Sequence, residues 1–158
     1  MRKLLIAILV TLGFSSSAQF SKYFYNKTLR IDYVHTGNAT SDAYAIDELI
    51  EEPFWGGSKV NLVNAMDYGN YKVTVQDIES GTVIYKHNYS SLFSEWQTTG
   101  EAKETFRAYP ENVVIPSPRK PVMVDFYNRT RNNEWILKFS YKLDPSSYFI
   151  KKERRHEY

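Results

Sequence analysis

Apolar and polar residues alternate along several segments of this chain, a pattern typical of strands with one buried face. Leu29, Ile31 and Tyr33 occupy every second position of one segment, with charged residues between them. Residues 71–76 repeat the alternation. Because successive side chains of a strand point to opposite faces, each segment predicts a half-buried β-strand.

Two pairs of alternating segments are joined by short polar turns and predict β-hairpins. The first hairpin spans residues 70–89, and its turn contains Gly81, a residue that adopts a positive φ without strain. The second runs from Val122 to Leu143 around a polar turn at residues 128–134. Both hairpins predict antiparallel sheet.

Only two stretches have a pattern that allows a helix. Residues 42–52 fit a short helix or an irregular strand equally well, and residues 91–97 fit one or two helical turns. Neither is long enough to cover a sheet of several strands, so two sheets must cover each other. The sequence therefore predicts an all-β fold, an antiparallel β-sandwich of immunoglobulin-like or jelly-roll-like type with one or two short helices.

The first 18 residues predict a secretory signal peptide. Arg2 and Lys3 precede an apolar run at residues 4–12, and small residues end the segment at Ala18. We expect cleavage near Ala18, a mature chain that begins near Gln19, and a periplasmic, cell-surface or extracellular location. No later segment has the roughly 20 apolar residues that a membrane span needs, so the mature protein is not expected to span a membrane.

The remaining residues have the size of one domain and a balanced charge. We expect the sandwich at residues 19–150 and a charged tail or a truncated interdomain linker at residues 151–158. Without Arg2 and Lys3, the chain has 18 basic and 18 acidic residues. This balance argues against a nucleic-acid partner, which requires a clustered basic face.

No pattern in the sequence predicts catalysis, a metal site or a cofactor. The chain has no cysteine, which excludes thiol chemistry and cysteine-based zinc sites. None of His35, His87 and His156 has a second ligand at the spacing by which two histidines on a helix hold a metal. The two histidines in predicted strands, His35 and His87, are interpreted as ordinary surface or rim residues.

Two aromatic segments, residues 53–58 and 92–97, supply the candidate contact residues Trp55, Phe93 and Trp96. A tryptophan in a loop can stack on a sugar ring or contact a neighbouring domain. The interpretation that we favour is structural: each side chain plugs the core at an end of the sandwich. Burial of one indole removes about 200 Å² of surface from water, which is a sufficient reason for its presence.

An ordered series of motifs resembles the N-terminal domain of the IgA-peptidase-type zinc metallopeptidases, peptidase family M64. The resemblance covers nearly all of residues 20–150. Its motifs are residues 28–33 with 35–38, then 55–58, then 81–85, then 92–99 with Glu101, and finally 116–118.

The resemblance implies an accessory domain. Members of the family are exported proteins in which a β-sandwich precedes a catalytic domain with a zinc-binding HExxH helix. No residue of this chain matches the metal ligands or the general-base glutamate, so we expect a non-catalytic domain that docks to or orients a zinc metallopeptidase domain and contacts its protein substrate. The alternative is a self-standing binding module for a carbohydrate or a host surface protein.

Overall fold

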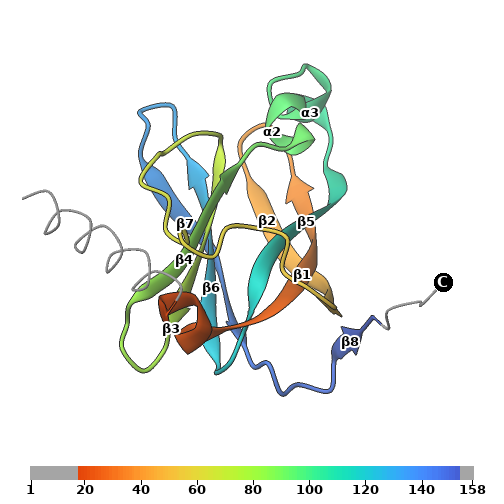
Figure 1. Ribbon diagram of the computed structural model, residues 1–158. Coiled ribbons are helices and arrows are strands. Elements are labelled where there is room, and N and C mark those ends of the chain that lie inside the picture. Colours follow the sequence, from red (N-terminus) through yellow and green to blue (C-terminus); the bar gives the residue numbers. More distant parts are fainter. Residues whose placement is uncertain (1–17, 154–158) are drawn as a thin grey trace, which may run out of the picture.

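Two four-stranded β-sheets pack face to face and form the body of the protein (Figure 1). The computed structural model describes residues 18–153, so most of the predicted signal peptide lies outside the described residues. The first sheet has the strand order β5-β1-β2-β8 and the second has the order β4-β3-β6-β7. The predicted β-sandwich is confirmed.

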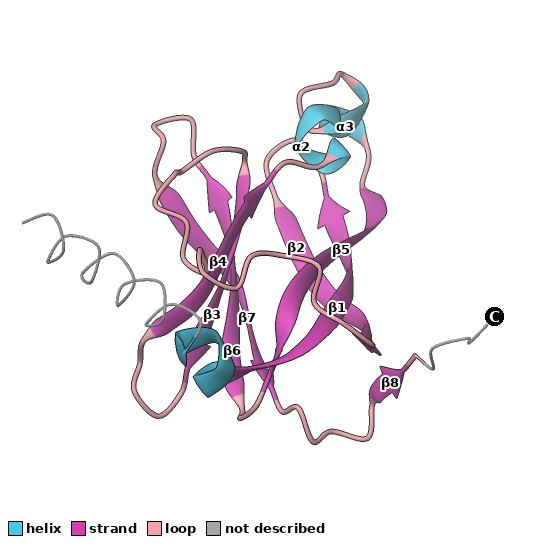
Figure 2. Ribbon diagram, viewed as in Figure 1, coloured by secondary structure: helices cyan, strands magenta, loops and turns pink. Residues whose placement is uncertain are grey.

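The strands of each sheet come from separate parts of the chain (Figure 2). The first sheet consists of β1 (Phe24–Gly37), β2 (Asp42–Glu52), β5 (Arg107–Pro118) and β8 (Ile150–Lys152). The second consists of β3 (Tyr71–Asp77), β4 (Val83–Tyr89), β6 (Val122–Arg129) and β7 (Trp135–Leu143). All neighbouring strands are antiparallel except β2 and β8, which are parallel.

Both predicted hairpins are present in the second sheet. β3 pairs with β4, and Gly81 in the turn between them has a φ of 68°. β6 pairs with β7 around the predicted polar turn. The central pair of this sheet, β3 and β6, joins the two hairpins across the sheet.

The segment with the ambiguous pattern, residues 42–52, is strand β2. It pairs with β1 along its whole length, but the register shifts where Tyr33 pairs with Ile46 and Asp32 pairs with Glu48. Asp47 is therefore an extra residue in β2, and a β-bulge reverses the phase of the alternation. For this reason Tyr44 and Leu49 are both buried despite their odd spacing.

Three short helices accompany the sheets, one more than the upper number predicted. α2 (Leu92–Trp96) lies within the predicted helical stretch, and α3 (Glu101–Glu104) follows it closely. Residues 18–23 form a further helical turn before β1. The buried ring of Phe20 in this turn packs 5.7 Å from the ring of Phe24, which explains why the segment is held against the sandwich.

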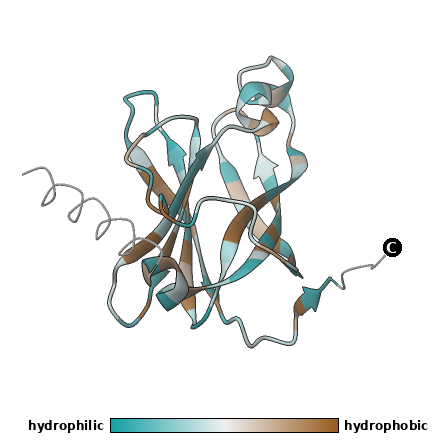
Figure 3. Ribbon diagram, viewed as in Figure 1, coloured by the Kyte–Doolittle hydropathy of each residue, from teal (hydrophilic) through white to brown (hydrophobic). Residues whose placement is uncertain are grey.

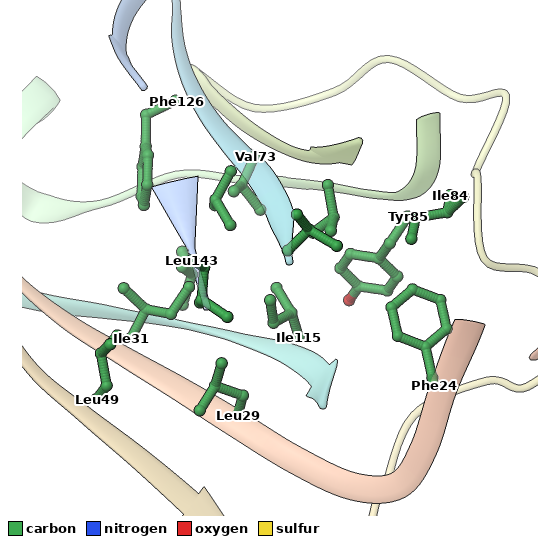
Figure 4. Packing of buried hydrophobic residues seen from close by; sticks show 14 of the residues in the cluster. Phe24, Leu29, Ile31, Leu49, Val73, Ile84, Tyr85, Ile115, Phe126 and Leu143 are labelled. Atoms are coloured by element: carbon green, nitrogen blue, oxygen red, sulfur yellow. The ribbon is translucent and has the colours of Figure 1, made fainter. Parts of the chain in front are cut away.

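The hydrophobic core lies between the two sheets. Alternating residues of β1, including Leu29 and Ile31, face Val73 and Phe126 of the second sheet (Figure 4). Apolar residues concentrate on the strands, whereas most turns are polar (Figure 3). This segregation is the distribution that the two-residue period predicts.

A long loop, residues 53–70, connects the first sheet to the second and runs past the edge strand β4 (Figure 1). Leu62 in this loop is buried in the core, and its carbonyl oxygen accepts a hydrogen bond of 2.9 Å from the Lys86 N–H. The loop is thereby attached to the sandwich near its middle.

The short strand β8 extends the first sheet beyond the expected domain boundary at residue 150. Ile150 is buried and pairs with Leu49, while Lys151 forms an ion pair with Glu48 at 2.5 Å. The Glu153 N–H donates a hydrogen bond of 2.9 Å to the Glu51 carbonyl. Residues 150–153 are therefore attached to the sandwich.

Candidate functional site

The three aromatic residues predicted as contact candidates all lie in the interior. The exposed fractions are 8% for Trp55, 0% for Phe93 and 7% for Trp96. Their burial agrees with the structural interpretation that we favoured over an exposed contact surface. A role in binding stays a prediction, and it would require contacts through the residues around them.

The two tryptophans are anchored in different ways. The Trp55 indole N–H donates to the Ser58 carbonyl at 3.1 Å, and its ring meets Tyr85 edge-to-face in the main core. The Trp96 indole N–H donates to the Glu101 carboxylate at 2.9 Å. Trp96 belongs with Phe93 to a separate small cluster under α2 and α3.

Close to this small cluster, a fully buried histidine lies between two carboxylates. His35 is on β1, Asp42 is at the start of β2, and Glu111 is on β5. The His35 Nε2 atom lies 2.9 Å from Asp42 Oδ2, and its Nδ1 atom lies 3.3 Å from Glu111 Oε2. Because an ionised carboxylate only accepts hydrogen bonds, both ring nitrogens must donate, and His35 is therefore protonated.

The pKa values of this triad shift in the direction that favours the charged forms. Burial disfavours the charge on His35, but its hydrogen bonds to Asp42 and Glu111 outweigh burial and raise its pKa above 6.5. Burial likewise opposes ionisation of Asp42, yet hydrogen bonds from His35, Lys138 and Asn128 lower its pKa to about 2. Despite its burial, Glu111 also has a lowered pKa, with the His35 hydrogen bond as the main cause.

Further polar groups connect the triad to the second sheet. Lys138 on β7 forms an ion pair with Asp42 at 2.5 Å, and the Asn128 amide on β6 donates to the same carboxylate. The Tyr33 hydroxyl donates to Glu111 at 2.9 Å and lies 2.9 Å from the Tyr89 hydroxyl on β4. The positive charges of His35 and Lys138 balance the negative charges of Asp42 and Glu111. The hydrogen bonds of these groups connect the first sheet to the second.

Aromatic rings cover both faces of the His35 imidazole. Tyr44 stacks on the ring with centroids 4.1 Å apart, and Phe93 of α2 stacks with centroids 3.8 Å apart. Tyr71 contacts the ring edge-on. The imidazolium is therefore enclosed by aromatic rings and carboxylates, which leaves no room for a substrate at this group.

A cavity of about 530 Å³ lies beneath the loop 53–70, between the edges of β4 and β5. Trp55 and Tyr85 contribute aromatic surface, and Asn61 and Asn64 contribute amide groups. The complete lining is Thr28, Glu52, Phe54, Trp55, Gly56, Gly57, Ser58, Asn61, Asn64, Tyr68, Tyr85, Lys86, His87, Asn88 and Val114.

A comparison with models of protein families shows which family the chain belongs to. The family model described as "Peptidase M64 N-terminus" matches residues 19–140. The chain belongs to the peptidase M64 N-terminal domain family. A comparison with curated proteins finds no match. The family that the sequence motifs indicate is thereby confirmed for most of the chain.

Zinc, which the M64 resemblance implies for a catalytic domain, does not fit the residues of this N-terminal domain that the structure describes. Asp42 and Glu111 contact opposite nitrogens of His35, so the three groups cannot converge on one ion. Within residues 18–153, no group of three or more histidine, aspartate or glutamate side chains is placed to hold a metal ion. The family model that matches is that of the N-terminal domain alone.

Among the described residues, no helix has the length and apolar character to cross a membrane. His35, which the sequence pattern predicts at the surface or rim, is instead fully buried. The alternation Leu29, Ile31, Tyr33 continues to His35, so this periodicity was the signal that His35 faces the core.

Proposed function

We propose that this domain is a non-catalytic accessory domain that docks to a zinc metallopeptidase domain and orients it. The observation that carries the proposal is the match of residues 19–140 to the N-terminal domain family of peptidase M64. The proposal includes export through the predicted signal peptide, because the resembled peptidases are exported proteins.

The attachment of β8 supports an orienting role. A connection that fixes the position of a second domain must itself be held by the first. Here Ile150 is buried against the first sheet, and Lys151 pairs with Glu48. The chain therefore leaves the sandwich from a defined point and in a defined direction.

Two aromatic side chains next to β8 are suited to contact the partner domain. Tyr148 is 86% exposed and Phe149 is 69% exposed, and their rings pack against each other with centroids 4.1 Å apart. Exposed aromatic residues that a rigid scaffold holds in place are common anchors of protein interfaces. We place the docking contact on this pair.

The proposal is tested by association of two separate chains. The full chain and a catalytic domain from the same peptidase family are mixed, and binding is measured by calorimetry. We expect association, with at least about a tenfold loss of affinity in the double variant Tyr148→Ser/Phe149→Ser, which corresponds to about 1.4 kcal/mol.

Phe106→Ser is the matched control. Phe106 is 66% exposed, close to the 69% of Phe149, but it lies just before β5, far along the chain from β8. Its affinity should equal that of the unchanged chain. Absence of association at high micromolar concentration would refute docking. Equal binding by the double variant would remove Tyr148 and Phe149 from the contact.

A further inference from the structure

We propose that the cavity beneath the loop 53–70 binds a neutral saccharide. This site goes beyond docking to a metallopeptidase domain and lies on different residues from Tyr148 and Phe149. Its volume of about 530 Å³ falls within the range of about 300–1,000 Å³ that is usual for small-molecule sites. Four features of its wall favour this ligand, namely the paired charges, the aromatic rings, the amide groups and one glycine.

The charged groups of the wall are already paired, which favours an uncharged ligand. Glu52 forms an ion pair with Arg30 at 3.4 Å, and Lys86 forms one with Asp67 at 3.0 Å. Burial lowers the pKa of His87, so this imidazole is neutral at pH 7. A charged ligand would have no free counter-charge among these groups.

The aromatic groups of the wall consist of a buried base, where Trp55 and Tyr85 are each 8% exposed, and an exposed rim that offers ring surface. The indole N–H of Trp55 is already donated to Ser58, and Trp55 and Tyr85 pack edge-to-face with centroids 5.9 Å apart. At the rim, Phe54 and Tyr68 are exposed. A sugar ring has apolar C–H faces that pack on such aromatic rings while its hydroxyl groups point to polar neighbours.

Amide groups of the loop provide partners for hydroxyl groups. The Asn61 side chain is exposed and has no hydrogen-bond partner among the described residues, so both its donor and its acceptor are available. The Asn64 oxygen accepts from the Met66 N–H at 2.9 Å, which leaves its NH₂ group to donate. An amide that both donates and accepts matches a sugar hydroxyl, which does the same.

Two adjacent glycines in the wall have different reasons to be glycine. A Cβ on Gly57 would lie 2.3 Å from an atom of the Trp55 ring, so packing of the indole excludes a side chain there. A Cβ on Gly56 would meet no atom within 4 Å, and its backbone does not have a positive φ. Gly56 has no packing or backbone requirement, and it lines the cavity, so a large side chain at this position is a means to reduce the open volume.

The cavity is built for binding and lacks the groups for glycoside cleavage. Hydrolysis of a glycosidic bond generally uses two carboxyl groups on opposite sides of the bond. Glu52 is the only carboxylate among the residues that line this cavity, and it is paired with Arg30. The expected event is therefore reversible association without chemistry.

The test places a larger side chain at the wall of the cavity, at a position where glycine is not needed for the fold. Saturation-transfer NMR of the full chain is recorded with lactose, cellobiose and N,N′-diacetylchitobiose, each up to about 10 mM, which covers weak affinities. We expect at least one disaccharide to bind, and Gly56→Leu to weaken that binding at least about tenfold. Asn61→Ala, which removes an exposed side chain, should weaken it severalfold.

Gly100→Leu is the matched control, because a Cβ on Gly100 also meets no atom within 4 Å and Gly100 does not line the cavity. Thermal unfolding confirms that each variant is folded, and if Gly56→Leu does not fold, Asn61→Ala decides. Absence of binding by all three disaccharides, or unchanged binding in the cavity variants, overturns the proposal. Loss of metallopeptidase association in Gly56→Leu with no saccharide binding would also overturn it and would assign the cavity to docking.

Discussion

The segments around Trp55 and Trp96 bury their indole rings to nearly the same extent, but their surroundings differ. Trp55 is part of the main core between the sheets and also forms one wall of an open cavity. Trp96 belongs to a small cluster with Phe93 and Ala102, and it lines none of the cavities described within residues 18–153. Similar sequence patterns therefore give one indole that forms part of a candidate binding site and one that lines none of these cavities.

The difference comes from what each segment covers. α2 and α3 cover the charged His35 triad, and Phe93 stacks directly on its imidazole. Tyr44 and Phe93 occupy the two faces of this imidazole, and His35 is fully buried. The loop 53–70 instead covers a cavity wall of apolar and neutral groups together with Glu52 and Lys86, which are paired with Arg30 and Asp67.

The largest expected effect distinguishes the two tryptophans. Trp55→Ala should lower the free energy of unfolding by about 3–5 kcal/mol, as is usual for loss of a large aromatic residue from a core. Trp96→Ala should cost less, by at least about 1 kcal/mol, because its cluster is small and can open locally. Urea unfolding followed by circular dichroism measures both values.

Equal losses for the two variants would show that the α2–α3 cluster is as tightly coupled to global stability as the main core. Trp55→Phe is a suitable control, since it keeps an aromatic ring against Tyr85 and removes the bond to Ser58. Its loss should be smaller than that of Trp55→Ala.

A substitution at His35 probes the end of the sandwich under α2 and α3. His35→Gln removes the positive charge between Asp42 and Glu111, and we expect a loss of about 3 kcal/mol, because a buried carboxylate then remains without its partner. Lys138→Met is the control, since it removes a partly exposed partner of Asp42 and should cost less. A loss of under about 1 kcal/mol for His35→Gln would contradict a charged triad.

The smallest expected effect is a dependence of stability on pH. The pKa of His35 is raised in the folded protein, so its stabilising contribution is complete below pH 6.5 and is lost as the pH rises through the raised value. The loss is about 1.4 kcal/mol for each unit by which the pKa is raised. Asp42 acts in the opposite direction, because its contribution is lost as the pH falls from 3.8 towards 2.

Urea midpoints measured between pH 5 and 9 test this dependence. The unchanged protein should lose stability on the alkaline side, and His35→Gln should show a flatter profile over the same range. His87→Gln serves as the comparison, because the pKa of His87 is lowered by burial and its contribution has the opposite sign. An alkaline loss that persists in His35→Gln would assign it to another group.

The strands could be predicted because burial on one face imposes a two-residue period. This held for β1 and for both hairpins. The period failed to distinguish helix from strand at residues 42–52, because the bulge at Asp47 reverses the phase within one strand. A bulge depends on the partner strand, which lies outside the local sequence.

The candidate sites were harder to predict because their residues come together only through sheet pairing. Asp42 and Glu111 reach His35 from both neighbouring strands, and nothing in the local sequence links the three. The cavity likewise depends on the path of the loop 53–70 across the edge of the sandwich. Of the residues that line it, only Trp55 was a candidate from the sequence.

The parallel pairing of β8 with β2 has a mechanical consequence. While Glu153 is bonded to Glu51, any segment that follows starts from a fixed point on the first sheet. Release of residues 144–153 would lengthen that tether by up to about 30 Å, at roughly 3.3 Å per extended residue. The three residue pairs between β2 and β8 therefore decide whether this connection is short or long. Their loss requires no rearrangement of the rest of the sandwich.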